Sequence, residues 1–275
     1  MMTIDFNDDV FTSMYDSCPF WSSQFVYTIL DKIILRENAV VLDVGTGTGV
    51  PAIEIAERMG KNTIVYAIDH WEAALKRAEA KALQLDVKNV IFKKASVLDI
   101  PFQDGFFDCV VSNNCLNNVD EFDAALNEYH RVLKVGGRMI QAFNLPESLK
   151  EFYDVYQNLL MEKRMMAEID ALNNHIFEKR KSTAFTAEAT IRAGFSIVEA
   201  TEHCFSWRFY NGTSLLNYSF VKMGWLSGWQ KIVNASQRDK LFTELEAKLN
   251  IFARDNNGLN LKIPYACIVA EKTKN

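Results

Sequence analysis

The chain has 275 residues, 49% of them hydrophobic, which is enough apolar material for one large packed domain or for a domain with insertions. Its formal net charge of −5 argues against a nucleic-acid partner, because neutralising phosphates requires a basic face. No apolar run approaches the ~18 residues of a membrane span, and the acidic N-terminus lacks the apolar segment of a secretory signal, so we expect a cytoplasmic protein with no membrane partner.

The predicted elements begin with an alternation of strands and helices. Strand-like runs lie at residues 39–44, 63–68, 89–94, 106–112 and 137–144, and amphipathic helical stretches lie between them at 71–84 and 120–134. Nearly all-apolar strands that alternate with helices are typical of a parallel sheet covered on both faces.

After residue 145 the pattern changes. Residues 146–182 are charged and helical, a short helix at 186–194 leads into a strand at 195–202, and residues 205–229 contain eight aromatic side chains. A capping-box pattern at Ser236 and Asp239 predicts the start of another helix, and a last strand is expected at 263–271.

If the last two strands join the same sheet, the fold is α/β: a doubly wound, mostly parallel, seven-stranded sheet. Residues 146–182 and 205–262 are then insertions, and we expect them to form a helical cap.

The stretch VVLDVGTGTGV, residues 40–50, places an acidic residue and three alternating glycines directly after the first strand. A dinucleotide turn needs G-x-G-x-x-G, and counted from Gly45 the third glycine falls on Val50. Counted from Gly47, the third glycine position falls on Ala52, which is a tolerated variant, but this register gives Asp43 no role in binding the cofactor. The spacing therefore disfavours an NAD-dependent oxidoreductase. The pattern D-x-G-x-G-x-G instead resembles motif I of class I S-adenosylmethionine-dependent methyltransferases.

Three further stretches carry the same resemblance. Asp69 ends the second strand, and residues 95–114 resemble the third and fourth motifs of the family, with Ile100-Pro101-Phe102 for the usual Leu-Pro-Phe. Residues 128–139 resemble E-x-x-R-V-L-K-P-G-G, with Val135 in place of proline. The resemblance covers residues 38–145 and implies a Rossmann-like fold, S-adenosyl-L-methionine as cofactor and S-adenosyl-L-homocysteine as product.

On this basis we divide the chain as follows: an N-terminal lid or helix (1–37), the cofactor-binding core (38–145), a helical cap insertion (146–182), a core helix and strand (183–204), an aromatic-rich cap insertion (205–262), and a final core strand with its tail (263–275).

The resemblance also implies site residues. The backbone of the turn would receive the methionine carboxylate, Asp43 the ammonium group, and Asp69 the ribose hydroxyls, although Asp69 also suits a helix cap. His70 would lie beside the adenosine, as a neighbour more readily than as a catalyst. Aligned on Ile100, the adenine position falls on Ser96 and the Val97 amide, with Asp99 as the alternative, and Asn113 would lie below the sulfonium methyl. The predicted cofactor residues are Asp43, Gly45, Thr46, Gly47, Gly49, Asp69, His70, Ser96, Val97 and Asn113.

Acceptor contacts are predicted in three places. Residues 14–25 resemble a lid in which Tyr15 and Trp21 contact ligand, or else a hydrophobic staple on the core. Asn114 is expected at the mouth of the fourth strand, unless the asparagine pairs there only form a loop. Trp207, Phe209 and Tyr210 suit the walls of a pocket for an apolar or aromatic small molecule, or equally the core of the cap.

The predicted reaction is methyl transfer by in-line displacement, and no catalytic base is predicted. The five scattered cysteines lack a CxxC pair and predict neither a metal site nor arsenite chemistry. The rival hypothesis is a non-catalytic S-adenosylmethionine-binding protein whose cap binds a protein partner. The oligomeric state is not predicted.

Overall fold

The computed structural model describes residues 9–18 and 20–274, so residues 1–8 of the expected lid lie outside the described residues. The chain forms two compact units. The first comprises the described residues up to Phe143, Ser182–His203 and the chain from Tyr265 onward, and the second comprises Asn144–Lys181 and Cys204–Pro264.

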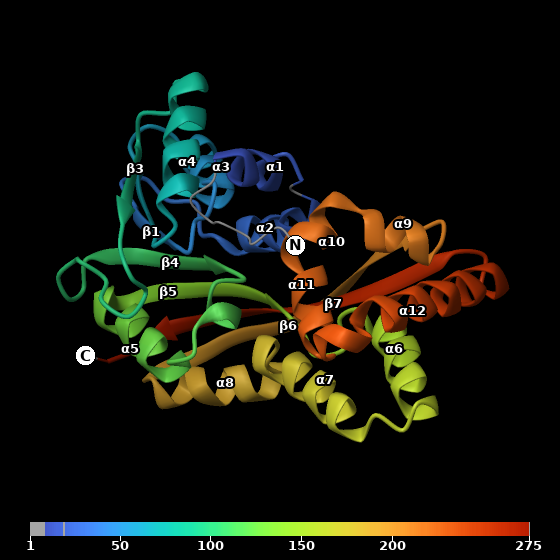
Figure 1. Cartoon of the computed structure of the whole chain (residues 1–275). Coiled ribbons are helices and arrows are strands. Elements are labelled where there is room, and N and C mark those ends of the chain that lie inside the picture. Colours follow the sequence, from blue (N-terminus) through green and yellow to red (C-terminus); the bar gives the residue numbers. More distant parts are fainter. Residues whose placement is uncertain (1–8, 19, 275) are drawn as a thin grey trace. The chain divides into compact units, whose positions relative to one another are not determined.

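One seven-stranded sheet organises the first unit, and its strand order is β3-β2-β1-β4-β5-β7-β6. Strand β1 pairs in parallel with β2 and β4, β2 pairs in parallel with β3, and β4 pairs in parallel with β5. Figure 1 shows β7 running opposite to β4 and β5. The predicted doubly wound, mostly parallel sheet is thereby confirmed. The strands are β1 (Val40–Val44), β2 (Ile64–Asp69), β3 (Val90–Lys94), β4 (Phe107–Asn113), β5 (Leu133–Asn144), β6 (Phe195–Phe209) and β7 (Leu259–Lys272).

Helices cover both faces of this sheet. Figure 1 shows α2 (Phe20–Lys32), α3 (Val50–Met59) and α4 (Glu72–Gln84) on one side, with α5 (Phe122–Val132) and α8 (Thr183–Arg192) on the other. The strands between them are apolar for this reason, and Val41, Leu42 and Val44 of β1 are fully buried. The first helix, α1 (Asp9–Asp16), packs against α4.

The second unit is mainly helical. Its helices are α6 (Lys150–Glu162), α7 (Met166–Lys179), α9 (Gly212–Asn217), α10 (Ser219–Gly224), α11 (Leu226–Lys231) and α12 (Ala235–Asp255). Trp229 is its largest fully buried side chain: the indole stacks on Phe152 with ring centroids 4.1 Å apart, and its N–H donates to the Tyr153 hydroxyl at 3.0 Å. Stability of this unit therefore depends strongly on aromatic packing.

Three boundaries differ from the sequence prediction. The helical stretch 146–182 is broken between α6 and α7, where Arg164 adopts a φ of 58°. Helix α12 starts at Ala235 after Asn234, so the capping box predicted at Ser236 is wrong. Strand β6 continues to Phe209, so the first residues of the predicted aromatic insertion belong to the sheet. In residues 205–209 half-buried aromatic and exposed polar side chains alternate, which is the period of a strand.

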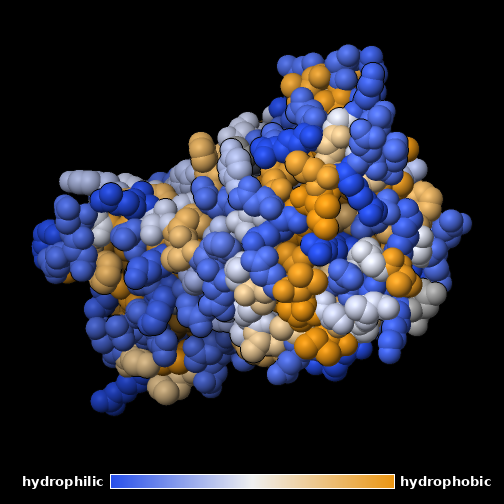
Figure 2. Space-filling view, turned by 180° about the vertical axis from the view of Figure 1, so that it is seen from behind, coloured by the Kyte–Doolittle hydropathy of each residue, from blue (hydrophilic) through white to orange (hydrophobic). Residues whose placement is uncertain are grey.

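In the described part of the chain, no helix combines the length and the apolar character needed to cross a membrane. Figure 2 shows a largely hydrophilic surface in which hydrophobic side chains are interspersed. Exposed large hydrophobic side chains in the first two helices include Val10, Met14, Phe20 and Tyr27.

Candidate functional site

The glycine turn connects the end of β1 to the start of α3. The amides of Gly45 and Thr46 both donate to the Ile68 carbonyl of β2, at 2.9 and 3.1 Å, and the Gly49 amide donates to the Thr46 carbonyl at 2.9 Å. Gly45, Gly47 and Gly49 have φ values of 72°, 55° and 83°. The turn therefore needs left-handed backbone at three alternate positions, which explains the glycine spacing.

The three glycines meet different surroundings. A Cβ on Gly45 would lie 2.5 Å from the Sγ of Cys115, and one on Gly49 would lie 2.6 Å from the Cβ of Ala78. A Cβ on Gly47 would meet no atom within 4 Å. Gly45 and Gly49 are thus required by packing inside the protein, whereas Gly47 faces open space where a ligand can approach the backbone.

Asp43 is the most unusual polar residue of the site. It lies fully buried in β1, and neither oxygen of its carboxyl group has a hydrogen-bond partner among the residues described. Burial raises its pKa to about 7; the negative charge of Asp69 adds to the rise, and the nearby Thr46 hydroxyl and Ala52 amide offset part of it. A buried carboxyl group without a partner is destabilising, so this position is suited to a cationic group supplied from outside.

Asp69, at the end of β2, joins the turn to the next helix. Its Oδ2 accepts from the Gly47 amide and its Oδ1 from the Trp71 amide, both at 2.8 Å. The carboxylate thus has a structural role, and each oxygen keeps a further lone pair for a ligand hydroxyl. His70 follows with a side chain that is 92% exposed, its Nδ1 lying 3.5 Å from Asp69 Oδ1.

The N-terminal helix reaches this edge of the sheet. The Tyr15 ring packs edge-on against Trp71 with centroids 5.4 Å apart, and burial together with the charge of Asp69 raises the pKa of its hydroxyl. Asp16 accepts from Arg77 at 2.8 Å and from Lys81 at 2.6 Å, which ties α1 to α4. Trp21 is buried beside Phe25, with ring centroids 5.7 Å apart.

Two asparagines end β4. The Oδ1 of Asn113 is buried and has no hydrogen-bond partner within the described residues. Asn114 has a φ of 54°, its amide donates to the Ala142 carbonyl at 2.9 Å, and its Oδ1 accepts from the Asn117 amide at 3.2 Å. Asn114 therefore shapes the loop, and Asn113 places an unpaired acceptor at the end of the strand.

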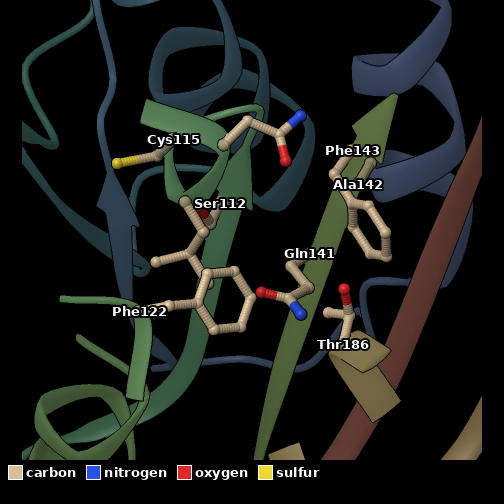
Figure 3. A pocket seen from close by; sticks show the side chains of 9 residues that line it. Ser112, Cys115, Phe122, Gln141, Ala142, Phe143 and Thr186 are labelled. Atoms are coloured by element: carbon tan, nitrogen blue, oxygen red, sulfur yellow. The ribbon is translucent and has the colours of Figure 1, made fainter. Parts of the chain in front are cut away.

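A small pocket next to this loop contains residues that we did not predict. It lies between β4, β5, α5 and α8, and Figure 3 shows Gln141 directed into it beside Phe122 and Thr186. Gln141 is 2% exposed, and neither its amide nitrogen nor its amide oxygen has a partner in the described part of the chain. Leaving such a group unsatisfied costs about 1–3 kcal/mol. The sequence signal was a single amide within the buried strand RMIQAF.

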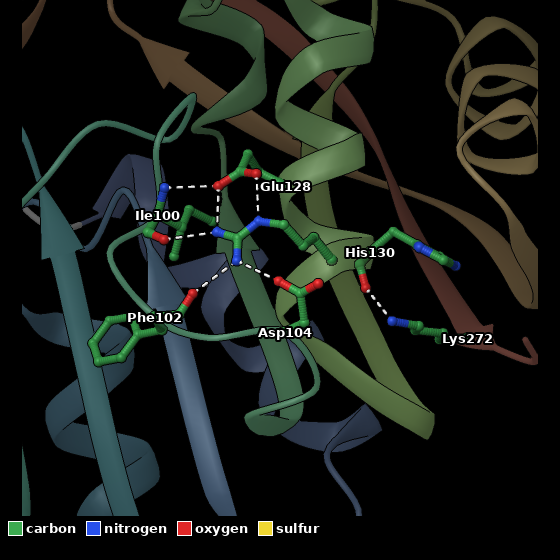
Figure 4. Close-up of polar contacts among 7 residues, drawn as sticks. Ile100, Phe102, Asp104, Glu128, His130 and Lys272 are labelled. Carbon is green, nitrogen blue, oxygen red and sulfur yellow. Dashed lines mark hydrogen bonds and ion pairs between the residues drawn. The ribbon is translucent and has the colours of Figure 1, made fainter. Parts of the chain in front are cut away.

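The predicted adenine positions lie on a loop that Arg131 holds in place (Figure 4). Arg131 donates to the carbonyls of Ile100 and Phe102, each at 2.8 Å, and to the carboxylates of Asp104 and Glu128. Glu128 in turn accepts from the Ile100 amide at 2.8 Å. The E-x-x-R motif therefore anchors residues 100–104 to α5, which explains its spacing.

Ser96 and Val97 precede this anchored segment. The Ser96 hydroxyl accepts from the Leu98 amide at 3.1 Å, and its carbonyl accepts from the Asp99 amide at 3.3 Å. Both Ser96 and Asp99 are exposed, and Val97 is half-buried. The loop thus keeps both candidate acceptors for adenine at the surface, close to the end of β3.

The three aromatic acceptor candidates lie in the second unit. Trp207 packs among Phe209, Tyr218, Phe220 and Trp225, with ring centroids 5.3–6.1 Å apart. Phe209 and the 85% exposed Tyr210 line a cavity of about 730 Å³. Most other side chains around this cavity are basic or amide groups, including Arg208, Arg254, Asn211, Asn250, Asn257 and Asn260.

A glycine turn after β1, with carboxylates at the ends of β1 and β2, is typical of α/β folds that bind nucleosides and nucleotides. Residues 35–190 match the family described as "Methyltransferase domain". UbiE of Vibrio cholerae serotype O1, a ubiquinone/menaquinone biosynthesis C-methyltransferase, is 34% identical over 132 residues, which are 46% of this chain and 51% of the relative. The chain spans about half the length of the curated relatives it matches.

Solved structures agree at the level of the fold. The YcgJ protein from Bacillus subtilis superimposes with a TM-score of 0.60 at 17% identity, over 91% of this chain and 98% of that one. A geranyl diphosphate methyltransferase in complex with S-adenosylmethionine (SAM) superimposes with a TM-score of 0.56 at 17% identity, over 91% and 85%. Because the family match spans more than half of its length, the chain belongs to the methyltransferase-domain family, with the class I fold of SAM-dependent enzymes.

Proposed function

We propose that this protein transfers the methyl group of SAM to a small, apolar or aromatic acceptor by in-line displacement, releasing S-adenosyl-L-homocysteine. The observation that carries the proposal is the buried Asp43 carboxyl group, which lacks a partner among the described residues and lies in β1 just before a turn whose Gly47 borders open space. The ammonium group of the methionine part of SAM would supply the hydrogen-bond and ionic partner that the Asp43 carboxyl group lacks among the described residues.

Other residues of the first unit suit the remaining parts of the cofactor. In our proposal the start of α3 binds the methionine carboxylate, since a helix N-terminus favours an anion. The amides of Gly45, Thr46, Gly47 and Gly49 already donate within the protein and serve to hold the turn open. Asp69 accepts from the ribose hydroxyls through its free lone pairs, with His70 beside it, and Ser96 with the Val97 amide contacts adenine.

When bound, SAM supplies a methyl group activated by the sulfonium, so the residues of the chain mainly bind, orient and exclude water. We assign Asn113, at the end of β4, to the position next to the methyl group. Tyr15, which covers Trp71 from α1, would help to exclude water from the adenosine side. The Cys115 thiol is no candidate for a base, because burial raises its pKa to about 12.

The acceptor class is supported by two observations. The curated relatives are named for ubiquinone and menaquinone biosynthesis, and the side chains of Phe122 and Phe143 line the pocket beside the β4 loop. Trp207, Phe209, Tyr210, Trp21 and Asn114 remain predicted acceptor contacts. For the first three, replacement with alanine should raise the apparent KM of the acceptor and leave SAM affinity within a few-fold.

Two measurements test the function. Isothermal titration calorimetry with SAM and with NAD shows which of the two cofactors the protein binds. A protein that binds NAD and does not bind SAM would refute the proposal. Transfer of the labelled methyl group from SAM to a metabolite extract then separates an enzyme from a non-catalytic SAM-binding protein, which would bind the cofactor without turnover.

A further inference from the structure

Gln141 presents a hydrogen-bonding surface that the protein itself does not use. The residue lies on β5 opposite Ser112 of β4, and paired residues of parallel neighbours project to the same face of a sheet. Its side chain is 2% exposed, and both ends of the amide lack a partner among residues 9–18 and 20–274. An amide offers two donors and one acceptor oxygen, so the side chain can bind a group that donates, accepts or does both.

The polar neighbours of Gln141 are engaged with other groups. The Thr186 hydroxyl donates to the Ser182 carbonyl at 3.0 Å, and the Ser112 hydroxyl accepts from the Tyr129 hydroxyl at 3.3 Å. Neither of these bonds satisfies the amide. Figure 3 shows the side chains of Gln141, Phe122 and Thr186 directed toward the same pocket.

The size and walls of this space limit what it can take. Its volume is about 10 Å³, which holds one oxygen-sized group. Carbons of Leu116, Phe122 and Phe143 line the space, so a polar atom that the Gln141 amide binds there would lie among apolar side chains. A hydroxyl group on an otherwise apolar molecule matches both features.

The pocket is also next to the expected point of methyl transfer. Ser112 directly precedes Asn113, and Cys115, Leu116 and Asn117 of the following loop line the pocket. In open α/β sheets ligands bind outside the carboxyl ends of the strands, and Gln141 lies near that end of β5.

We propose that Gln141 is a specificity-determining residue that binds a hydroxyl oxygen of the methyl acceptor, which makes the acceptor a hydroxylated apolar or aromatic molecule. This inference rests on the proposed function. The Gln141 amide hydrogen-bonds the acceptor hydroxyl and thereby selects hydroxylated molecules over their unsubstituted analogues.

The experiment uses two probes that differ by one oxygen, 1-naphthol and naphthalene, and the protein saturated with S-adenosylhomocysteine. Equilibrium affinities are measured for the wild type, for Gln141→Met, which keeps the length and removes the amide, and for Gln84→Met as a control on an exposed glutamine of α4. In parallel, the side-chain amide signals of the wild type are followed by ¹H–¹⁵N spectroscopy during titration with each probe.

We expect the wild type and Gln84→Met to prefer 1-naphthol by about fivefold to tenfold, and Gln141→Met to reduce that preference to about twofold or less. The Gln141 amide signal, identified by its loss in Gln141→Met, should shift with 1-naphthol and not with naphthalene. Absence of binding, equal binding of both probes, or a preference that survives Gln141→Met would overturn the inference and leave a buried water as the partner of the amide. SAM affinity of the same proteins reports separately on the proposed function.

Discussion

Replacing Asp43 with asparagine tests whether the carboxyl group of this residue binds a ligand or supports the structure of the turn. The substitution keeps the shape of the side chain and removes its ability to ionise. Because Asp43 is fully buried and has no hydrogen-bond partner among the described residues, we expect the unliganded Asp43→Asn variant to gain stability relative to the wild type as the pH rises. We expect SAM binding to weaken at the same time.

The magnitude follows from the pKa of Asp43. Folding raises it from 3.8 to about 7, so between these values the folded state binds a proton that the unfolded state has lost. The free energy of unfolding therefore falls as pH rises through this window, and the full penalty is present above pH 7. At about 1.4 kcal/mol per pKa unit, the penalty is about 2 kcal/mol at pH 5 and about 4 kcal/mol at pH 8.

The asparagine amide does not titrate, and its own burial cost is the same at both pH values. The stability difference between Asp43→Asn and wild type should therefore move by about 2 kcal/mol in favour of the variant from pH 5 to pH 8. Loss of the charged partner should weaken SAM binding by roughly 10-fold to 100-fold. Wild-type affinity should also fall as the pH drops below 7, because the carboxyl group must ionise to bind an ammonium group.

Urea denaturation at pH 5 and pH 8 measures the first effect, and calorimetric titration of SAM at pH 6 and pH 7.5 measures the second. Asp86→Asn, at an exposed aspartate paired with Lys88, is the matched control. A variant that loses stability equally at both pH values, or that binds SAM like the wild type, would show that Asp43 only supports the turn.

The other predictions concern the turn and its supports. Gly47→Ala should lower the free energy of unfolding by about 1–2 kcal/mol, the cost of a left-handed alanine, yet abolish most SAM binding measured by calorimetry. Gly45→Ala should destabilise more than Gly47→Ala, because a clash with Cys115 adds about 1–3 kcal/mol to the same left-handed cost, and Cys115→Gly should restore the clash part of the loss in denaturant titrations. Asp69→Asn should reduce both the melting temperature and SAM affinity, since one of two backbone bonds is lost; unchanged stability would contradict the contacts seen. Arg131→Lys should destabilise by about 1–3 kcal/mol and speed hydrogen exchange in residues 100–104, with exchange elsewhere as the internal control.

Much of the first unit could be predicted because its signals are local. Apolar runs of strand length, helical periodicity between them and the alternating glycines all lie within short windows of sequence. The glycine turn was predicted from spacing alone, and the structure shows left-handed backbone at each of its three glycines. The extension of β6 to Phe209 was missed because its aromatic residues were read as an insertion, although their alternation has the period of a strand.

Contacts between distant segments could not be predicted. The packing of Cys115 against Gly45 and the pocket that brings Thr186 to Gln141 join residues that lie far apart in the chain. The role of Arg131 was hidden for the same reason: its motif was visible, but its carbonyl partners lie about thirty residues earlier. Local patterns report which face of an element is buried, and not what it is buried against.

The distribution of unsatisfied polar groups supports a single functional edge in the first unit. Most buried side-chain polar atoms that lack a partner in the described residues belong to Asp43, Thr46, Asn113 and Gln141. These residues lie in β1, β4, β5 and the turn after β1, near the carboxyl ends of adjacent strands. Elsewhere the strands of this sheet bury mainly apolar side chains. The unsatisfied polar groups are therefore concentrated at this edge and are not a general feature of the core. Each unsatisfied group costs about 1–3 kcal/mol in the unliganded protein, and a ligand that satisfies it recovers that energy as affinity. Substitutions that stabilise the empty protein at this edge should therefore weaken binding, whereas equally stabilising changes in α12 of the second unit should leave SAM affinity unaffected.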